Sequence, residues 1–151
     1  MPTLHEYPVT VEWAGGRDGG GTVSTGHSGA SVAIAVPPEF QGPGGGASPE
    51  ELLTSAIASC YTITFGIIAA NRKIPVRDVH VEATGVVEQN GPSFKYVSVT
   101  VRPRIVLGVE ATEEQIRLAE DMAHKADAYC IVTNAVRGTV HIVVEPKIST
   151  G

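Results

Sequence analysis

One long stretch of the chain, residues 52–70, contains no charged side chain and follows a strong helix-start signal. Ser48 can accept hydrogen bonds from the first free amides of a helix, Pro49 suits the first helical position, and Glu51 completes a capping box. The side chains that follow recur at helical spacing, and the predicted apolar stripe is Leu53, Ala56, Ile57, Cys60, Thr64, Ile67 and Ile68. The pattern therefore predicts a long helix in which Cys60 is buried or nearly so.

Shorter segments of alternating apolar and polar residues flank this helix on both sides. A glycine-rich turn at residues 15–21 and the Gln89-Asn90-Gly91 turn each predict a hairpin. A second capping box, Thr112 with Gln115, predicts a helix from about residue 113 to about residue 126. The predicted strands cover residues 9–13, 22–25, 31–36, 79–88, 94–106 and 138–145.

The order of these elements is β-β-β-α-β-β-α-β, which has few parallel crossover units. Antiparallel sheets wrapped around a long central helix, an α+β architecture, are therefore expected rather than a doubly wound fold. A length of 151 residues predicts a single domain, residues 1–151. A helix without charge for five turns needs cover on all sides, so we expect an intertwined homodimer that packs through this helix.

Composition narrows the class of partner. The net charge is −5 and aromatic residues make up only 5% of the chain, which argues against nucleic acid or anionic lipid as a partner. Residues 1–9 contain Glu6 and two prolines, and no basic region leads into an apolar run. No signal peptide is expected there, and a cytoplasmic location is the default expectation.

A membrane span is the alternative interpretation of residues 52–70, because about 20 apolar residues cross a bilayer. Hydroxyl side chains interrupt the segment at Thr54, Ser55, Ser59, Thr62 and Thr64. These residues make a mediocre membrane segment, and the amphipathic strands on either side suit a domain that wraps a helix. We therefore expect no membrane partner.

Several segments, in the same order, resemble the organic hydroperoxide resistance (Ohr) and OsmC family over nearly the whole chain. They are Gly15-Gly16-Arg17-Asp18-Gly19, then Ser48-Pro49-Glu50-Glu51-Leu52-Leu53 with Ala56 and Cys60, then Cys130 with Thr133-Asn134-Ala135-Val136-Arg137-Gly138. The glycine-flanked arginine and the interval from Glu50 to Cys60 are more like the Ohr branch. The family's second cysteine is usually followed by proline, whereas Ile131 follows it here.

The resemblance implies a thiol peroxidase whose active sites lie at the subunit interface of a homodimer. Carried over to this chain, Cys60 is the peroxidatic cysteine, Cys130 the resolving cysteine, Arg17 the activating cation and Glu50 the carboxylate partner of Arg17. The implied substrate is an organic hydroperoxide, the implied reductant is a dithiol such as a lipoylated protein, and no flavin, haem or metal is required.

The proposed chemistry needs these residue types together. A free thiol has a pKa of about 8.5, and burial alone would reduce its thiolate fraction further. A guanidinium from Arg17 would favour the Cys60 thiolate, and Glu50 would hold the guanidinium in position. Attack on a peroxide gives a sulfenic acid, which Cys130 can condense with to form a disulfide. The aliphatic stripe around Cys60 predicts a preference for alkyl or lipid hydroperoxides over hydrogen peroxide.

Helix geometry adds a prediction about the dimer. Ten residues separate Glu50 from Cys60, which is a rise of about 15 Å along a helix axis. Glu50 therefore cannot easily serve the Cys60 of its own helix. If two central helices pack antiparallel, Glu50 of one subunit approaches Cys60 of the other, and the site is composite.

Each feature also has another interpretation. Cys60 and Cys130 are compatible with inert core thiols, since free cysteine is often buried. A metal site built from Cys60, Cys130, His124 and His141 lacks the short ligand spacing of structural zinc. The glycine-rich residues 42–48 at a helix start could suggest phosphate binding, but no lysine follows. A non-catalytic stress or ligand-binding protein with the same fold is the alternative from another functional class.

Overall fold

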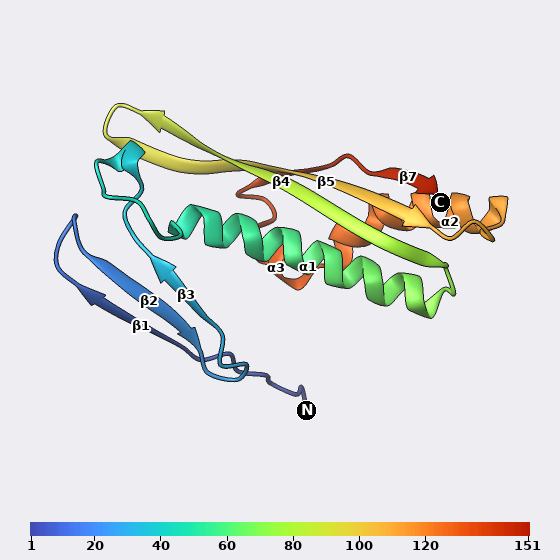
Figure 1. The fold of residues 1–151 in the computed structure, drawn as a ribbon, viewed down its shortest axis with the longest axis horizontal. Coiled ribbons are helices and arrows are strands. Elements are labelled where there is room, and N and C mark those ends of the chain that lie inside the picture. Colours follow the sequence, from blue (N-terminus) through green and yellow to red (C-terminus); the bar gives the residue numbers. More distant parts are fainter. The chain divides into compact units, whose positions relative to one another are not determined.

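The computed structural model covers residues 1–151 and contains two compact units, Met1–Leu52 and Leu53–Gly151. The N-terminal unit is built on a three-stranded antiparallel sheet in the order β1-β2-β3 (Figure 1). Its strands are β1 (Val9–Ala14), β2 (Gly20–Thr25) and β3 (Ser31–Ile34), and a short 3-10 helix, η1 (Pro38–Phe40), follows. The predicted hairpin and third strand are thereby confirmed. The prediction of one domain stays a prediction.

The N-terminal sheet has little core of its own. Every residue of β1 is exposed, including Val9 at 60%, Val11 at 56% and Trp13 at 42%. Val9, Val11 and Trp13 alternate along β1 and so lie on one face of the sheet, and an apolar sheet face is ordinarily covered by another layer. The single chain therefore leaves apolar strand surface available for a further contact.

The long helix α1 (Pro49–Asn71) begins where the sequence predicts. The Glu51 amide donates to Ser48 Oγ over 3.2 Å, and the Ser48 amide donates to Glu51 Oε1 over 3.0 Å, which completes the capping box. Hydrogen bonds from the Ser48 backbone and side chain lower the pKa of the Glu51 carboxyl. By length and composition alone, α1 could cross a membrane, a test that the core helix of a soluble protein also passes.

The buried face of α1 differs from the predicted stripe. Its fully buried residues are Ile57, Tyr61, Phe65 and Ala69, spaced four apart. Ile67 is 57% exposed, so its assignment to the buried stripe was wrong, and Cys60 is half-buried at the edge of that face. The large rings of Tyr61 and Phe65 determine which face of α1 is buried. The sequence did not reveal this face, because apolar residues occur on every side of the helix.

The C-terminal unit holds a long hairpin of β4 (Val76–Asn90) and β5 (Ser93–Leu107), which confirms the predicted turn around Gly91. Gly91 has a φ of 62°, which suits glycine in such a turn. Two further strands, β6 (His141–Val144) and β7 (Lys147–Thr150), pair with β5 in parallel. The parallel pairing and the second of these strands are not in the sequence prediction.

The core of this unit lies between its sheet and two helices, α1 and α2 (Glu113–Lys125). The Tyr61 hydroxyl donates to the carbonyl oxygen of Ala123 over 2.6 Å and joins the helices. Burial, with the nearby Asp127 charge, raises the pKa of Tyr61. The β5 side chains that complete the core are Val99, Val101, Ile105 and Leu107. The structure confirms the α+β class and the capping box of α2 at Thr112.

Two short helices connect α2 to β6, and the sequence analysis predicted neither. They are the 3-10 helix η2 (Ala126–Tyr129) and α3 (Ile131–Val136). Cys130 lies at the junction between them and is fully buried. This connection is what places Cys130 against the face of α1 that carries Cys60.

Candidate functional site

Cys130 is held by the start of α3. It is the N-cap residue of this helix, in an extended conformation, and its sulfur accepts a hydrogen bond from the Thr133 amide over 3.4 Å. The role that serine or aspartate commonly plays at a helix start thus falls to a cysteine. Because of this unusual cap, α3 lacks the usual sequence signal of a helix start.

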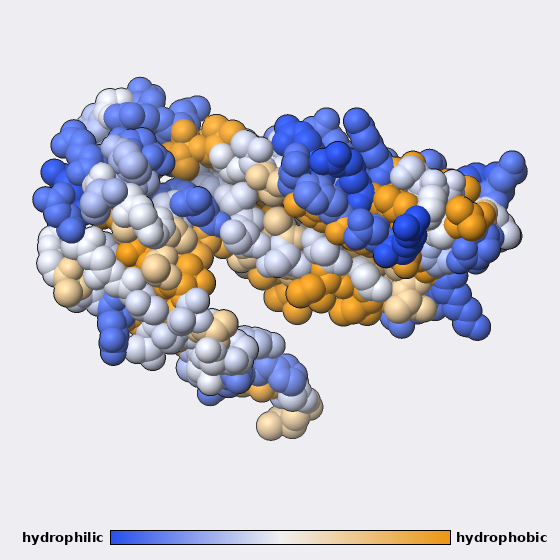
Figure 2. All heavy atoms as spheres, in the orientation of Figure 1, coloured by the Kyte–Doolittle hydropathy of each residue, from blue (hydrophilic) through white to orange (hydrophobic).

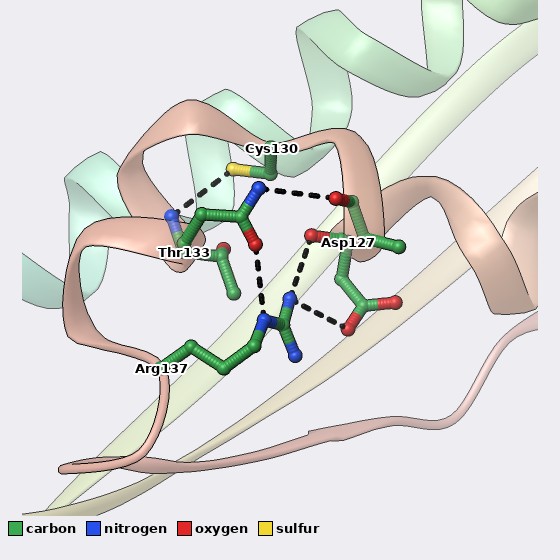
Figure 3. Close-up of polar contacts among 6 residues, drawn as sticks. Asp127, Cys130, Thr133 and Arg137 are labelled. Carbon is green, nitrogen blue, oxygen red and sulfur yellow. Dashed lines mark hydrogen bonds and ion pairs between the residues drawn. The ribbon is translucent and has the colours of Figure 1, made fainter.

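Arg137 fastens the junction of η2 and α3 (Figure 3). Its Nε donates to Asn134 Oδ1 over 3.0 Å, and its Nη2 donates to the Asp127 carbonyl oxygen over 2.9 Å. Asn134 Nδ2 in turn donates to the carbonyl oxygen of Ala128 over 3.0 Å. These bonds join residues before and after Cys130, so they fix the position of its sulfur.

The structure brings Cys60 and Cys130 together. Both are free cysteines, and each sulfur is close enough to affect the pKa of the other. The backbone amides of Val132 and Ile131 act on the Cys60 sulfur in the direction that lowers its pKa, and the sulfur lies 4.0 Å from Thr64 Oγ1. Ile131 and Val132 are the first residues of α3, whose amides have no partner inside the helix. Backbone groups have no sequence signature, so these amides could not be predicted from the residues.

The two sulfurs are electrostatically unequal. Burial raises the pKa of the Cys60 thiol, but the bonds from Cys130, Val132, Thr64 and Ile131 outweigh it, and the net pKa is lowered. For Cys130, burial and the bond with Cys60 raise the pKa, and Thr133 only partly offsets them. These opposite pKa shifts favour ionisation at Cys60 over ionisation at Cys130.

The other two predicted site residues belong to the N-terminal unit. Arg17 is exposed in the turn between β1 and β2, where the Gly19 amide donates to the Gly16 carbonyl oxygen over 2.9 Å. Glu50 lies in the first turn of α1. Their roles beside Cys60 stay predictions.

An apolar hollow of about 240 Å³ lies in the N-terminal unit. Trp13 and Phe40 contribute aromatic walls, and Glu50 contributes the one ionisable side chain of the lining. A hollow of this composition suits an apolar group whose polar end lies near the carboxylate.

The metal and phosphate interpretations find no support in the geometry. No three histidine, cysteine, aspartate or glutamate side chains converge on a possible metal position, and both His124 and His141 are exposed. In the glycine-rich loop, the amides of Gly42 and Gly44 donate to the carbonyl oxygens of Pro37 and Val36. Those amides are therefore not available to cradle a phosphate.

The fold and the site define an α+β protein with a pair of neighbouring free cysteines, one of which caps a short helix. The chain belongs to the OsmC-like family, whose model matches residues 42–145. The resemblance inferred from the sequence is thereby confirmed.

Some relatives in sequence are named as uncharacterized proteins, and others are named for organic hydroperoxide resistance. The uncharacterized protein YmaD of Bacillus subtilis is 31% identical over 147 residues, 97% of each chain. A Staphylococcus aureus protein named "organic hydroperoxide resistance protein-like" is 29% identical and covers 74% of this chain and 77% of its own length. The family thus includes Ohr-named relatives and relatives without an assigned activity.

Solved structures confirm the fold. An OsmC-like protein of unknown function from Vibrio cholerae, VCA0330, has a TM-score of 0.80 at 21% identity, over 95% of this chain and all of that one. A Legionella pneumophila structure titled as an organic hydroperoxide resistance protein OsmC has a TM-score of 0.70 at 26% identity, over 99% of both chains. The architecture is therefore that of OsmC and Ohr proteins.

Proposed function

We propose that the protein is a thiol peroxidase that reduces organic hydroperoxides to alcohols in oxidative-stress defence. The observation that carries the proposal is the pairing of Cys60 with Cys130, in which Cys60 has a lowered pKa and Cys130 a raised one. A nucleophilic sulfur beside a protonated sulfur is the arrangement that such a cycle requires. Names of the Ohr-like relatives support the same reaction.

The cycle uses the two sulfurs in turn. The Cys60 thiolate attacks one peroxide oxygen, the O–O bond breaks, and the leaving alkoxide takes up a proton to become an alcohol. The resulting Cys60 sulfenic acid reacts with the Cys130 thiol, which forms a disulfide and releases water. An external dithiol then reduces this disulfide and is itself oxidised to a disulfide.

Arg17 and Glu50 complete the site in this proposal. The Arg17 guanidinium would add positive charge beside the Cys60 thiolate, and Glu50 would orient it through charge-assisted hydrogen bonds. The apolar hollow next to Glu50 supports a preference for hydroperoxides with an alkyl or aryl group.

We propose a homodimer as the active form. Ile63 and Ile67 of α1 are 63% and 57% exposed. Figure 2 shows apolar atoms along the lower edge of the C-terminal unit, over α1 and α3. A second copy that packs against α1 would cover this surface, and an antiparallel arrangement would bring Glu50 of one subunit to Cys60 of the other.

The recycling dithiol, proposed to be a lipoylated protein, suits a reducing compartment such as the cytoplasm.

The test is a peroxide reaction with a count of free thiols. Wild-type protein treated with cumene hydroperoxide should lose both thiols and gain a Cys60–Cys130 disulfide, measured by alkylation and mass spectrometry. Cys60→Ser should abolish peroxide consumption. Cys130→Ser should allow one oxidation at Cys60 and then stall without its resolving partner.

A non-catalytic ligand-binding protein would leave both thiols unchanged under the same treatment, and that result would refute the proposal. Replacing cumene hydroperoxide by hydrogen peroxide tests the substrate class. Comparable rates with both oxidants would contradict the preference for organic hydroperoxides.

A further inference from the structure

Thr133 has a hydroxyl group that the resting protein does not use. The residue is 1% exposed, and its Oγ1 is a fully buried side-chain oxygen without a hydrogen-bond partner. An unpaired buried hydroxyl destabilises a folded protein, so such groups are uncommon. The position of this hydroxyl indicates where it could find a partner.

The same residue already contacts the Cys130 sulfur. Its amide donates to Cys130 Sγ over 3.4 Å (Figure 3), and its side chain also acts on that sulfur in the direction that favours the thiolate. A thiol is a weak acceptor, whereas a thiolate accepts strongly. Formation of a Cys130 thiolate would therefore turn the unpaired hydroxyl into a charge-assisted donor.

A Cys130 thiolate arises at one step of the proposed cycle. Cys60 is half-buried and Cys130 is completely buried, so an incoming thiolate reaches the Cys60 sulfur of the disulfide more easily. When it bonds to Cys60, the Cys60–Cys130 bond breaks and its electron pair stays on Cys130. A buried sulfur is a poor leaving group unless nearby donors stabilise its charge.

We propose that Thr133 is a catalytic residue of the reductive half-reaction, in which its hydroxyl and amide stabilise the Cys130 thiolate as it leaves the disulfide. The inference rests on the proposed function and assigns a residue to its second half. After the step, Cys130 takes up a proton. The second thiol of the reductant then displaces Cys60 as a thiolate, which leaves the reductant oxidised and both cysteines reduced.

Thr133→Val tests the hydroxyl, because valine keeps the shape of threonine and removes the donor. Thr133→Ser is the matched control that keeps the hydroxyl. The full-length proteins are oxidised with diamide, which makes the disulfide without a peroxide, and are mixed with excess dithiothreitol. Reduction is followed by quenching, alkylation and mass spectrometry. The disulfide of the Thr133→Val protein should be reduced about tenfold more slowly than that of wild type, which corresponds to the loss of one charge-assisted hydrogen bond. The Thr133→Ser protein should recover most of the wild-type rate.

Two measurements separate this role from a structural one. Thr133→Val should unfold at the same temperature as wild type or higher, because it removes an unpaired buried hydroxyl. In a Cys60→Ser background, where Cys130 titrates alone, Thr133→Val should move the pH profile of Cys130 alkylation to higher pH, and Thr133→Ser should not.

Wild-type reduction rates in Thr133→Val would overturn the inference, as would a serine variant as slow as the valine variant or an unchanged alkylation profile. Failure of the wild-type protein to consume peroxide would instead overturn the proposed function. The diamide and alkylation experiments do not depend on that activity, so the two failures are distinguishable.

Discussion

At the scale of single residues, Ile131 illustrates how a departure from the family pattern acquires a physical meaning. The resemblance leads one to expect proline after the second cysteine, and proline has no amide hydrogen. The Ile131 amide helps to lower the pKa of Cys60, while the Ile131 side chain is 82% exposed. The peptide group of this residue therefore matters more to the site than its side chain.

Ile131→Pro removes that donor at a position that tolerates proline. Ile131 is the first residue of α3, and Cys130 before it is extended, with a φ of −80° and a ψ of 115°. Loss of the donor should raise the pKa of Cys60, and because the Ile131 amide is the smallest contribution to that pKa, the rate of oxidation by cumene hydroperoxide at neutral pH should fall by about twofold to threefold. Ile131→Ala keeps the amide and should react like wild type.

The pH dependence of the oxidation rate shows in which direction the Ile131 amide shifts the pKa of Cys60. The wild-type thiolate forms below the ordinary thiol range, because hydrogen bonds to the sulfur outweigh its burial. The oxidation rate of wild type should therefore reach its plateau at a lower pH than that of Ile131→Pro, and the two rates should converge in alkaline solution. Coinciding pH profiles for the proline and alanine variants would contradict the role of the Ile131 amide.

At the scale of the elements, α3 is the part of the site that the sequence did not reveal. It supplies the Val132 and Ile131 amides to Cys60 and is capped by Cys130 itself. The guanidinium of Arg137 holds this helix in place through Asn134 and Asp127. The lowered pKa of Cys60 and the position of Cys130 thus depend on the same short segment.

Arg137→Met keeps the aliphatic stem and removes the guanidinium donors that bind Asn134 and Asp127. Hydrogen exchange at the amides of Ile131 and Val132 should become faster, and disulfide formation after peroxide treatment should slow by roughly threefold to tenfold, since charged hydrogen bonds at a partly exposed site are lost. Arg117→Met removes an exposed arginine of α2 and serves as the control. Equal exchange rates in the two variants would show that Arg137 does not hold α3.

Elements with a local sequence signal could be predicted, whereas features that depend on packing or on long-range pairing could not. Capping boxes at Ser48 and Thr112 and the turn at Gly91 are local chemistry, and the structure confirms all three. The buried face of α1 was harder to predict, because apolar residues occur on every side of that helix and only packing selects Tyr61 and Phe65. The parallel pairing of β6 with β5 depends on a crossover through α3, a helix too short to show periodicity.

The candidate site also has a part that the sequence could predict and a part that required the structure. Cys60 and Cys130 could be named from their sequence neighbours through the family resemblance. Their contact, and the order in which they ionise, required the fold, because both depend on backbone amides and on the depth of burial. Thr133 belongs to the matched segment after Cys130, but a role for it follows only from the structure, in which its hydroxyl is buried and unpaired.

At the scale of the whole molecule, exposed apolar surface is the main evidence for a second subunit. Ile63 and Ile67 of α1 are exposed, as are Val9 and Val11 of β1. Apolar surface of this extent is unusual on a protein that acts as a monomer. A contact between two α1 helices would remove part of it from water.

Ile63→Asp should weaken such a dimer, because it places a charge in an apolar contact. Light scattering after size exclusion should show the wild type as a dimer and the variant shifted toward a monomer at micromolar concentration. Glu120→Lys changes an exposed residue of α2 and should leave the dimer intact. A wild-type protein that is monomeric at all concentrations would contradict the proposed assembly.

The composite site makes a stronger prediction about that dimer. Cys60→Ser and Glu50→Ala can be co-expressed with different tags, and purification through both tags isolates mixed dimers. In an antiparallel dimer, one of the two sites combines the intact Cys60 of one subunit with the intact Glu50 of the other. Mixed dimers should then show about half of wild-type peroxidase activity, well above either parent dimer, since a two-fold assembly has two equivalent sites. If each site is built within one subunit, every site of the mixed dimer lacks one of the residues, and activity stays at the average of the parents.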